Sequence, residues 1–319
     1  MADVKTKQDG GEPLVDVMGR FVHDGVTFPD IVMRESLDEL KTLDVRPDDV
    51  WVCTYPKAGT HFAMEIVALI LGDGNPHKIN RLTGMSTVAM PVFERPPPDD
   101  QPQGQPLDYL RNQPPILDMI KKAPSPRLII SHLPFQTLPP EIEKRAKVLY
   151  VARNPKDLAT STMKFIEKTM PVPGGFPQIL DDLMNGDNYC GWFNHVMEYW
   201  NKRDEKNVLF LKYEDMVMDL RGCVKKVAEL LEHPLTDDVF EKVVAGSEFK
   251  GMKKTYDTLE KSAEKGIFLT RAGGQKEMSF MQTGKIGTWK TKFTVAQSEM
   301  VDAWYKEKFA GQELQFQFE

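Results

Sequence analysis

The sequence is poor in cysteine, has no long apolar run and carries no excess of positive charge. Its three cysteines, Cys53, Cys190 and Cys223, form no CxxC pair, so neither a disulfide framework nor a cysteine-based zinc site is expected. The longest apolar stretch, residues 62–71, is too short to cross a membrane and includes Glu65. A net charge of −6 argues against general affinity for nucleic acid. We therefore expect a cytoplasmic protein whose partners are neither membranes nor nucleic acids.

Hydrophobic residues make up 41% of the chain, which is sufficient for a substantial core. We expect one domain over residues 1–319. Residues 1–12 are polar, lack the apolar segment of a secretion signal and are predicted to form a flexible tail. Residues 94–107 contain five prolines, which fix φ and remove backbone donors, so they are predicted to form a surface loop. A proline-rich recognition segment is the functional alternative.

Four short, largely apolar runs are typical of buried strands: residues 50–54, 128–131, 148–152 and 208–213. Helix-length segments separate these runs, as in βαβ units. The sequence therefore predicts an α/β fold in which helices flank a central, mostly parallel sheet. Ligands of such sheets bind at the carboxyl ends of the strands, so the chemistry is expected in the residues that follow each run.

The first of these runs leads into a glycine-containing turn, TYPKAGT, and then into a helix-like stretch. Backbone N–H groups of such a turn and the positive end of the helix dipole bind phosphate, and Lys57 and Thr60 add a charge and a hydroxyl donor. None of these contacts needs a metal. The lysine precedes Gly59, unlike in the GxxxxGK[ST] loop of nucleotide hydrolases. Alone, the string fits an ordinary strand-to-helix turn better than a phosphate site.

Longer matches change this interpretation. The segment TYPKAGTHF at residues 54–62 resembles the TYPKSGTTW signature of cytosolic sulfotransferases. Residues 131–134 (SHLP) are similar to KTHLP, residues 151–157 (VARNPKD) to VARNAKD with Ser161 eight residues after the arginine, and residues 280–284 (FMQTG) to FMRKG. The chain is identified as a member of this family because the four matches occur in the family's order.

The resemblance implies that the protein moves a sulfonate from 3′-phosphoadenosine 5′-phosphosulfate (PAPS) to a hydroxyl or amine of a small, mostly apolar acceptor, releasing 3′-phosphoadenosine 5′-phosphate (PAP). The reaction is an in-line displacement for which positioned cations supply most of the catalysis. Lys57 is the implied contact of the leaving phosphate, and His132 is the candidate general base. Taken singly, Lys57 would be a solvated surface lysine and His132 a structural histidine.

The resemblance also implies a set of nucleotide-binding residues. Arg153 and Ser161 correspond to ligands of the 3′-phosphate, although an arginine alone would be a surface ion-pair partner. Phe62, the weakest member of the adenine and ribose pocket, also fits the buried stripe of its helix. The full set is Lys57, Ala58, Gly59, Thr60, His61, Phe62, Arg153, Ser161, Tyr213, Ser247, Phe249, Met252, Gln282, Thr283 and Gly284.

Several positions depart from the family pattern. Ile130 replaces the lysine of KTHLP, His61 replaces a threonine, and Gln282 and Thr283 replace the Arg-Lys pair of FMRKG. The alternative hypothesis is therefore a catalytically weak or inactive protein of this fold that binds a nucleotide or another ligand. A small-molecule kinase is a third hypothesis, but no Walker lysine-serine pair accompanies the loop.

Residues 290–299, from Lys290 to Glu299, match the family's KxxxTVxxxE dimerisation segment. A homodimer is implied, and a loop leading into the final helix is the alternative. The acceptor is not identified by the sequence, since its pocket would be assembled from separate loops such as residues 21–28 and 85–93.

Overall fold

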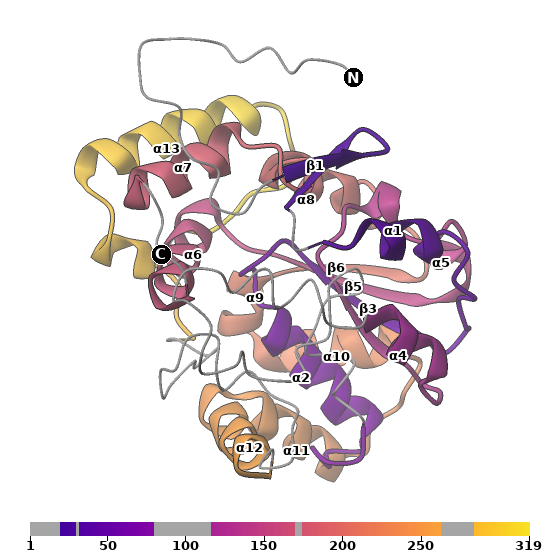
Figure 1. Ribbon diagram of the computed structural model, residues 1–319. Coiled ribbons are helices and arrows are strands. Elements are labelled where there is room, and N and C mark those ends of the chain that lie inside the picture. Colours follow the sequence, from indigo (N-terminus) through magenta and orange to yellow (C-terminus); the bar gives the residue numbers. More distant parts are fainter. Residues whose placement is uncertain (1–19, 30–31, 80–115, 170–173, 263–283) are drawn as a thin grey trace, which may run out of the picture.

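The structure is a computed structural model that describes most of the chain (Figure 1). The described residues are 20–29, 32–79, 116–169, 174–262 and 284–319. The predicted tail at residues 1–12 and the predicted proline-rich loop at residues 94–107 lie outside them.

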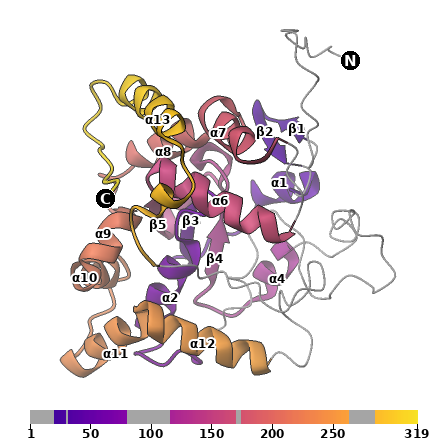
Figure 2. The same ribbon diagram turned by 90° about the vertical axis from the view of Figure 1, so that its left-hand side faces the viewer.

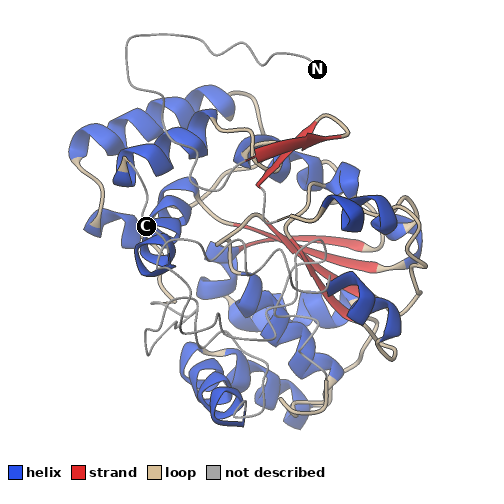
Figure 3. Cartoon of the chain, viewed as in Figure 1, coloured by secondary structure: helices blue, strands red, loops and turns tan. Residues whose placement is uncertain are grey.

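The core of the fold is a four-stranded parallel sheet. Its strand order is β4 (Leu128–Ser131), β3 (Val50–Thr54), β5 (Lys147–Ala152) and β6 (Val208–Lys212). Figure 3 shows these strands between layers of helices. The predicted mostly parallel sheet is therefore confirmed, and the strand bounds differ by one residue at β5 and β6.

The sheet is buried on both faces because alternate residues of each strand point into two separate apolar clusters. One cluster contains Trp51 and Tyr150 together with residues of α8 (Trp192–Trp200). The other contains Val52 and Leu149 together with residues of three helices, which are α2 (Thr60–Leu71), α10 (Leu220–Leu230) and α11 (Asp237–Ser247).

Local sequence signals explain where α6 begins and where α2 ends. The helix α6 (Pro155–Thr169) has proline at its first position, and the Asn154 side chain accepts a hydrogen bond from Asp157 N at 2.8 Å, as expected of an N-cap. The helix α2 ends before Gly72, which caps it. Tyr213, predicted at the end of a strand, instead begins α9 (Tyr213–Met218).

A two-stranded antiparallel hairpin precedes the sheet. It consists of β1 (Arg20–His23) and β2 (Val26–Pro29), and its turn residues Asp24 and Gly25 both have positive φ. Asp-Gly is a strong hairpin signal, but the flanking strands are too short to show a clear alternation, so the sequence analysis did not predict them.

The other helices pack around these elements, and α7 and α13 lie side by side in both ribbon views (Figures 1 and 2). Among the described residues, none of the helices combines the length and the apolarity of a membrane span. The remaining elements are α1 (Arg34–Leu40), α4 (Ile116–Lys122), η2 (Phe135–Thr137), α5 (Ile142–Arg145), α7 (Gly175–Asn185), α12 (Phe249–Ser262), η3 (Thr288–Thr291) and α13 (Val295–Lys308).

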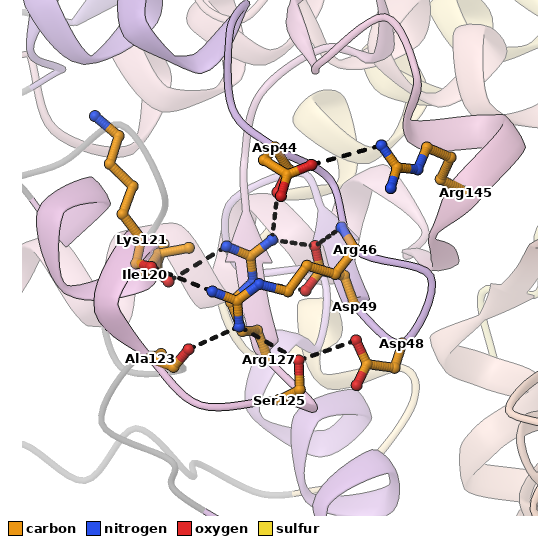
Figure 4. Close-up of polar contacts among 10 residues, drawn as sticks. All are labelled: Asp44, Arg46, Asp48, Asp49, Ile120, Lys121, Ala123, Ser125, Arg127 and Arg145. Carbon is orange, nitrogen blue, oxygen red and sulfur yellow. Dashed lines mark hydrogen bonds and ion pairs between the residues drawn. The ribbon is translucent and has the colours of Figure 1, made fainter.

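A buried ion pair fastens the amino ends of β3 and β4 (Figure 4). The Arg127 Nε donates to Asp49 Oδ1 at 2.6 Å, and its Nη2 donates to Asp49 Oδ2 and to the Asp44 carbonyl. Both ionic side chains are almost fully buried. Arg46 extends the network by donating to the Lys121 carbonyl in the last turn of α4 and to the Ala123 carbonyl just after it. The network lies at the amino ends of the strands, opposite the carboxyl ends.

Asp49→Asn should lower the free energy of unfolding by about 3–5 kcal/mol, because it leaves the Arg127 charge buried without its partner. Urea denaturation followed by circular dichroism measures the change. Asp238→Asn is the matched control, since it removes the partner of an exposed lysine and should have no measurable effect. Equal urea midpoints for the two variants would contradict the prediction that the buried Asp49–Arg127 pair stabilises the fold.

Candidate active site

The candidate site lies where β3, β4 and β5 end. The register pairs Cys53 with Ser131 and Thr54 with Val151, so the three strands finish at the same edge of the sheet. This alignment brings together the 55–59 turn after β3, His132 after β4 and Arg153 after β5.

The turn after β3 has an unusual backbone. Lys57 has a φ of +71° and Gly59 a φ of +115°. A side chain at Gly59 would place its Cβ 2.8 Å from a ring carbon of Tyr213, so only glycine fits. Ala58 N donates to the Tyr55 carbonyl at 3.1 Å, and α2 starts directly after Gly59. The positive φ of a lysine costs about 1–3 kcal/mol, which is typical of a functional turn.

His132 is joined to this turn through its ring. Its Nδ1 lies 2.8 Å from the Thr54 carbonyl and 3.2 Å from the Thr54 hydroxyl. Because a carbonyl can only accept, Nδ1 carries the proton and Nε2 of the neutral ring keeps its lone pair. Burial lowers the pKa of His132 to about 4, an effect that the Thr54 carbonyl opposes and the charge of Lys57 reinforces. At neutral pH the ring is thus a free base.

The site concentrates positive charge. The Lys57 ammonium lies 4.1 Å from the centre of the Phe165 ring. Burial, and then the charge of Arg153, lower the Lys57 pKa to about 8. Burial, followed by the charges of Lys57 and His132, lowers the pKa of His61 to about 3. At neutral pH both histidines are uncharged, so the repulsion is between Lys57 and Arg153, and a bound anion would relieve it.

Arg153 joins the turn to the aromatic part of the site. Its guanidinium carbon lies 4.3 Å from the centre of the Tyr213 ring, and Nη1 donates to the Lys57 carbonyl at 3.3 Å. Within the described residues, the buried Nε of Arg153 has no hydrogen-bond partner. Ser161 is also buried, in the second turn of α6.

The predicted nucleotide pocket falls into two groups of contacts. Phe62 meets Tyr213 edge to face, with ring centres 6.1 Å apart. Phe249, which is 42% exposed, lies against Gly284, where an added Cβ would be 3.0 Å from its ring.

Two further predicted pocket residues, Ser247 and Met252, are buried. The Ser247 hydroxyl lacks a hydrogen-bond partner in the part of the chain that the structure describes. Gln282 and Thr283 lie outside the described residues.

Two features of the site were missed by the sequence analysis. The first is Asp157, whose carboxylate accepts from Gly287 N, the Thr288 hydroxyl and Trp289 N, each at 2.9 Å. The neighbouring Lys156 pairs with Asp302 at 2.7 Å. The first turn of α6 thereby holds the C-terminal segment beside the Arg153 loop. The sequence shows these charges but not their distant partners.

The second feature is one face of α8. Its residues His195, Glu198 and Tyr199 bond to the segment that begins at His132. The i, i+3, i+4 spacing of these polar groups in an otherwise apolar helix is the signal that could have found them.

Among the residues that the structure describes, no group of three or more His, Cys, Asp or Glu side chains is arranged to hold a metal ion.

Comparisons with known proteins agree with the motifs. The family model described as sulfotransferase domain matches residues 47–313. Sulfotransferase 1B1 of Canis lupus familiaris is 35% identical over 290 residues, which are 88% of this chain and 90% of the relative. Human sulfotransferase 4A1 is 35% identical over 304 residues, which are 93% of each chain.

Solved structures share the fold. A retinol dehydratase in complex with androsterone and inactive cofactor PAP has a TM-score of 0.74 at 22% identity, covering 95% of this chain and 93% of that one. Mouse sulfotransferase SULT7A1 complexed with PAP has a TM-score of 0.68 at 24% identity, covering 92% and 95%.

The affinity of the site for an anion such as sulfate should fall by up to about tenfold per pH unit above pH 8, because the anion binds protonated Lys57 and the free lysine loses its proton there. Below about pH 7 the lysine is already protonated, so its contribution is constant. Calorimetry between pH 7 and 9.5 measures the slope. Lys57→Met should flatten it, while Lys206→Met, at an exposed position, should not. An unchanged slope in Lys57→Met would show that Lys57 is not the group whose deprotonation weakens anion binding.

Proposed function

Because the chain belongs to the sulfotransferase family, we propose that it transfers the sulfonate of PAPS to a hydroxyl or amine of a small, mostly apolar acceptor, with His132 as the general base. The observation that carries this proposal is the bond from His132 Nδ1 to the Thr54 carbonyl. This bond leaves Nε2 able to take a proton. The nearby positive charges of Lys57 and Arg153 suit an anionic donor.

The residues present fit the donor nucleotide. Arg153 Nε and the Ser247 hydroxyl are buried polar groups without partners among the described residues, and such groups are normally satisfied. Arg153 and Ser161 would hold the 3′-phosphate, and Lys57 and Thr60 the 5′-phosphosulfate. Phe62, with its ring against Tyr213, would pack on the base.

In the proposed reaction, the bound nucleotide supplies the sulfonate, which forms a bond to the acceptor oxygen or nitrogen as its bond to the phosphate breaks. His132 Nε2 takes the acceptor's proton. The Thr54 carbonyl stabilises the resulting imidazolium through Nδ1, and Lys57 compensates the charge that develops on the departing phosphate. All of these protein groups are in place before the reaction, so little reorganisation is required.

A buried aromatic series of the core borders the site turn. Phe21 and Phe28 of the hairpin have ring centres 5.8 Å apart, and Phe28 meets Tyr189 edge to face, also at 5.8 Å. Tyr189 in turn meets Tyr55 of the site turn at 6.4 Å. The androsterone in the retinol dehydratase complex, whose fold this chain shares, is, like the proposed acceptor, small and mostly apolar.

His132→Ala should lower turnover by about 10² to 10⁴, because it removes general-base assistance, while PAP affinity stays within about twofold. Initial rates with a panel of phenols, steroids, alcohols and amines measure turnover, and calorimetry measures binding. His233→Ala, which removes a surface histidine paired with Asp73, is the control. Turnover that persists in His132→Ala would rule out this mechanism.

The second candidate function is a weak or inactive enzyme that acts as a nucleotide- or ligand-binding module. The observation that favours it is the burial of Ile130. The side chain is only 2% exposed and packs in the apolar cluster on the α2 face, two residues before His132. This strand therefore presents no cation to the transferred group.

Calorimetry with PAP and ADP separates the two functions without knowledge of the acceptor. The proposed enzyme should prefer PAP over ADP, and Arg153→Met should weaken PAP binding by about 10- to 10²-fold, since bonds to charged groups contribute roughly 1.5–3 kcal/mol. Arg145→Met, at the opposite edge of the sheet, should change nothing. Wild-type protein that binds ADP as well as PAP would favour the second candidate.

We further propose that the protein is a cytoplasmic homodimer assembled through residues 290–299. Thr294 caps α13 with a reciprocal capping box, and the next residue, Val295, is 76% exposed. An apolar side chain held in place at a helix start suits a small self-complementary contact. Sedimentation equilibrium tests the dimer, and a monomer at all concentrations would refute it.

A further inference from the structure

The segment that carries His132 depends on α8 for its hydrogen bonds. After Ser131 the chain leaves the sheet, and buried carbonyls that have lost their sheet partners need other donors. His195 Nε2 lies 3.1 Å from the His132 carbonyl, and the Tyr199 hydroxyl donates to the Leu133 carbonyl at 2.8 Å. Glu198 accepts from Gln136 N at 3.3 Å and from Gln136 Nε2 at 2.9 Å. One helix face therefore anchors the whole segment.

The direction of these bonds follows from the chemistry of the groups. The His132 carbonyl can only accept, so His195 Nε2 carries a proton. Burial keeps His195 neutral by lowering its pKa to about 3, so Nδ1 has a lone pair. The Tyr150 hydroxyl, 2.9 Å away, must therefore donate to Nδ1. Tyr150 thus fixes the tautomer in which His195 can bond to His132.

Packing leaves this chain of bonds little freedom. Tyr150, His195 and Tyr199 are fully buried. The two tyrosine rings stack with centres 4.0 Å apart, and Tyr55 contacts the His195 ring edge to face at 5.4 Å. Turning the His195 ring would break bonds at both nitrogens without access to water.

We propose that His195 is a positioning residue: its bond to the His132 carbonyl, together with the bond from His132 Nδ1 to Thr54, fixes the base so that Nε2 faces the acceptor. The base residue is then held at its backbone by α8 and at its ring by β3. The kinetic part of this inference rests on the proposed sulfonate transfer. Misplacement of a reacting group by about 1 Å can cost roughly 10²-fold in rate, so the loss of one anchor should be measurable.

A matched pair of substitutions tests the role. The amide nitrogen of Gln in His195→Gln can occupy the position of Nε2 and donate to His132, whereas that of Asn in His195→Asn reaches only the position of Nδ1. Both variants are polar and smaller than histidine. His195→Asn should lower kcat by about 10- to 10²-fold, with PAP affinity unchanged, and His195→Gln should recover kcat to within about threefold of wild type.

A second readout requires no turnover. In the wild type, the ¹⁵N signals of the His132 ring should show a protonated Nδ1 and an unprotonated Nε2. His195→Asn should give mixed tautomers or a broadened ring, and His195→Gln should keep the wild-type pattern. Tyr150→Phe should shift the His132 signals in the same direction as His195→Asn, but less, because it frees the tautomer of His195 and leaves its ring in place.

The outcomes are distinguishable. If both His195 variants lose melting temperature to the same extent while the His132 signals stay unchanged, His195 is only part of the core and the proposal is wrong. If the wild type transfers no sulfonate, the proposed function fails, and the His132 signals alone then support or refute the positioning role.

Discussion

The hydrogen bond between the Thr54 carbonyl and His132 Nδ1 is the contact on which the site depends. It joins the end of β3, where the turn that carries Lys57 begins, to the end of β4, after which His132 follows. It also sets which ring nitrogen is free. The bond is possible because β3 and β4 pair in a register that ends them together, and the Asp49–Arg127 ion pair fixes their opposite ends. The position of His132 is thus a consequence of sheet geometry.

Around this bond, the positive charges of Lys57 and Arg153 make the site more stable with an anion bound than without one. Burial lowers the pKa values of Lys57, His61 and His132, and the charge of Lys57 contributes to the lowering at both histidines. At neutral pH the two histidines are uncharged, so a negative charge would stabilise the site by relieving the repulsion between Lys57 and Arg153. The stored repulsion, together with the positive φ of Lys57, is the kind of local cost that the rest of a fold supports at a functional site.

The sequence predicted the parts of the fold that local signals determine. The four strands, the Asn154 cap of α6 and the Gly72 stop of α2 depend on neighbouring residues, and each was placed to within about one residue. The contacts of Asp157 with residues 287–289 join positions about 130 residues apart, so local patterns could not reveal them. The same holds for α8, whose His195 bonds to a carbonyl 63 residues away. The candidate site residues could be named from the sequence only because four motifs occur together, and their roles stay predictions.

At Ile130, the departure from the family pattern affects charge more than shape. Ile130 keeps the strand and its packing but supplies no cation, whereas His132 and Arg153 contact the turn through the Thr54 and Lys57 carbonyls. With a pKa of about 8, Lys57 is roughly nine-tenths protonated at pH 7, so the charge of the turn remains available where that of β4 is missing. If the protein transfers sulfonate as proposed, Lys57 and Arg153 must therefore supply the positive charge that β4 does not.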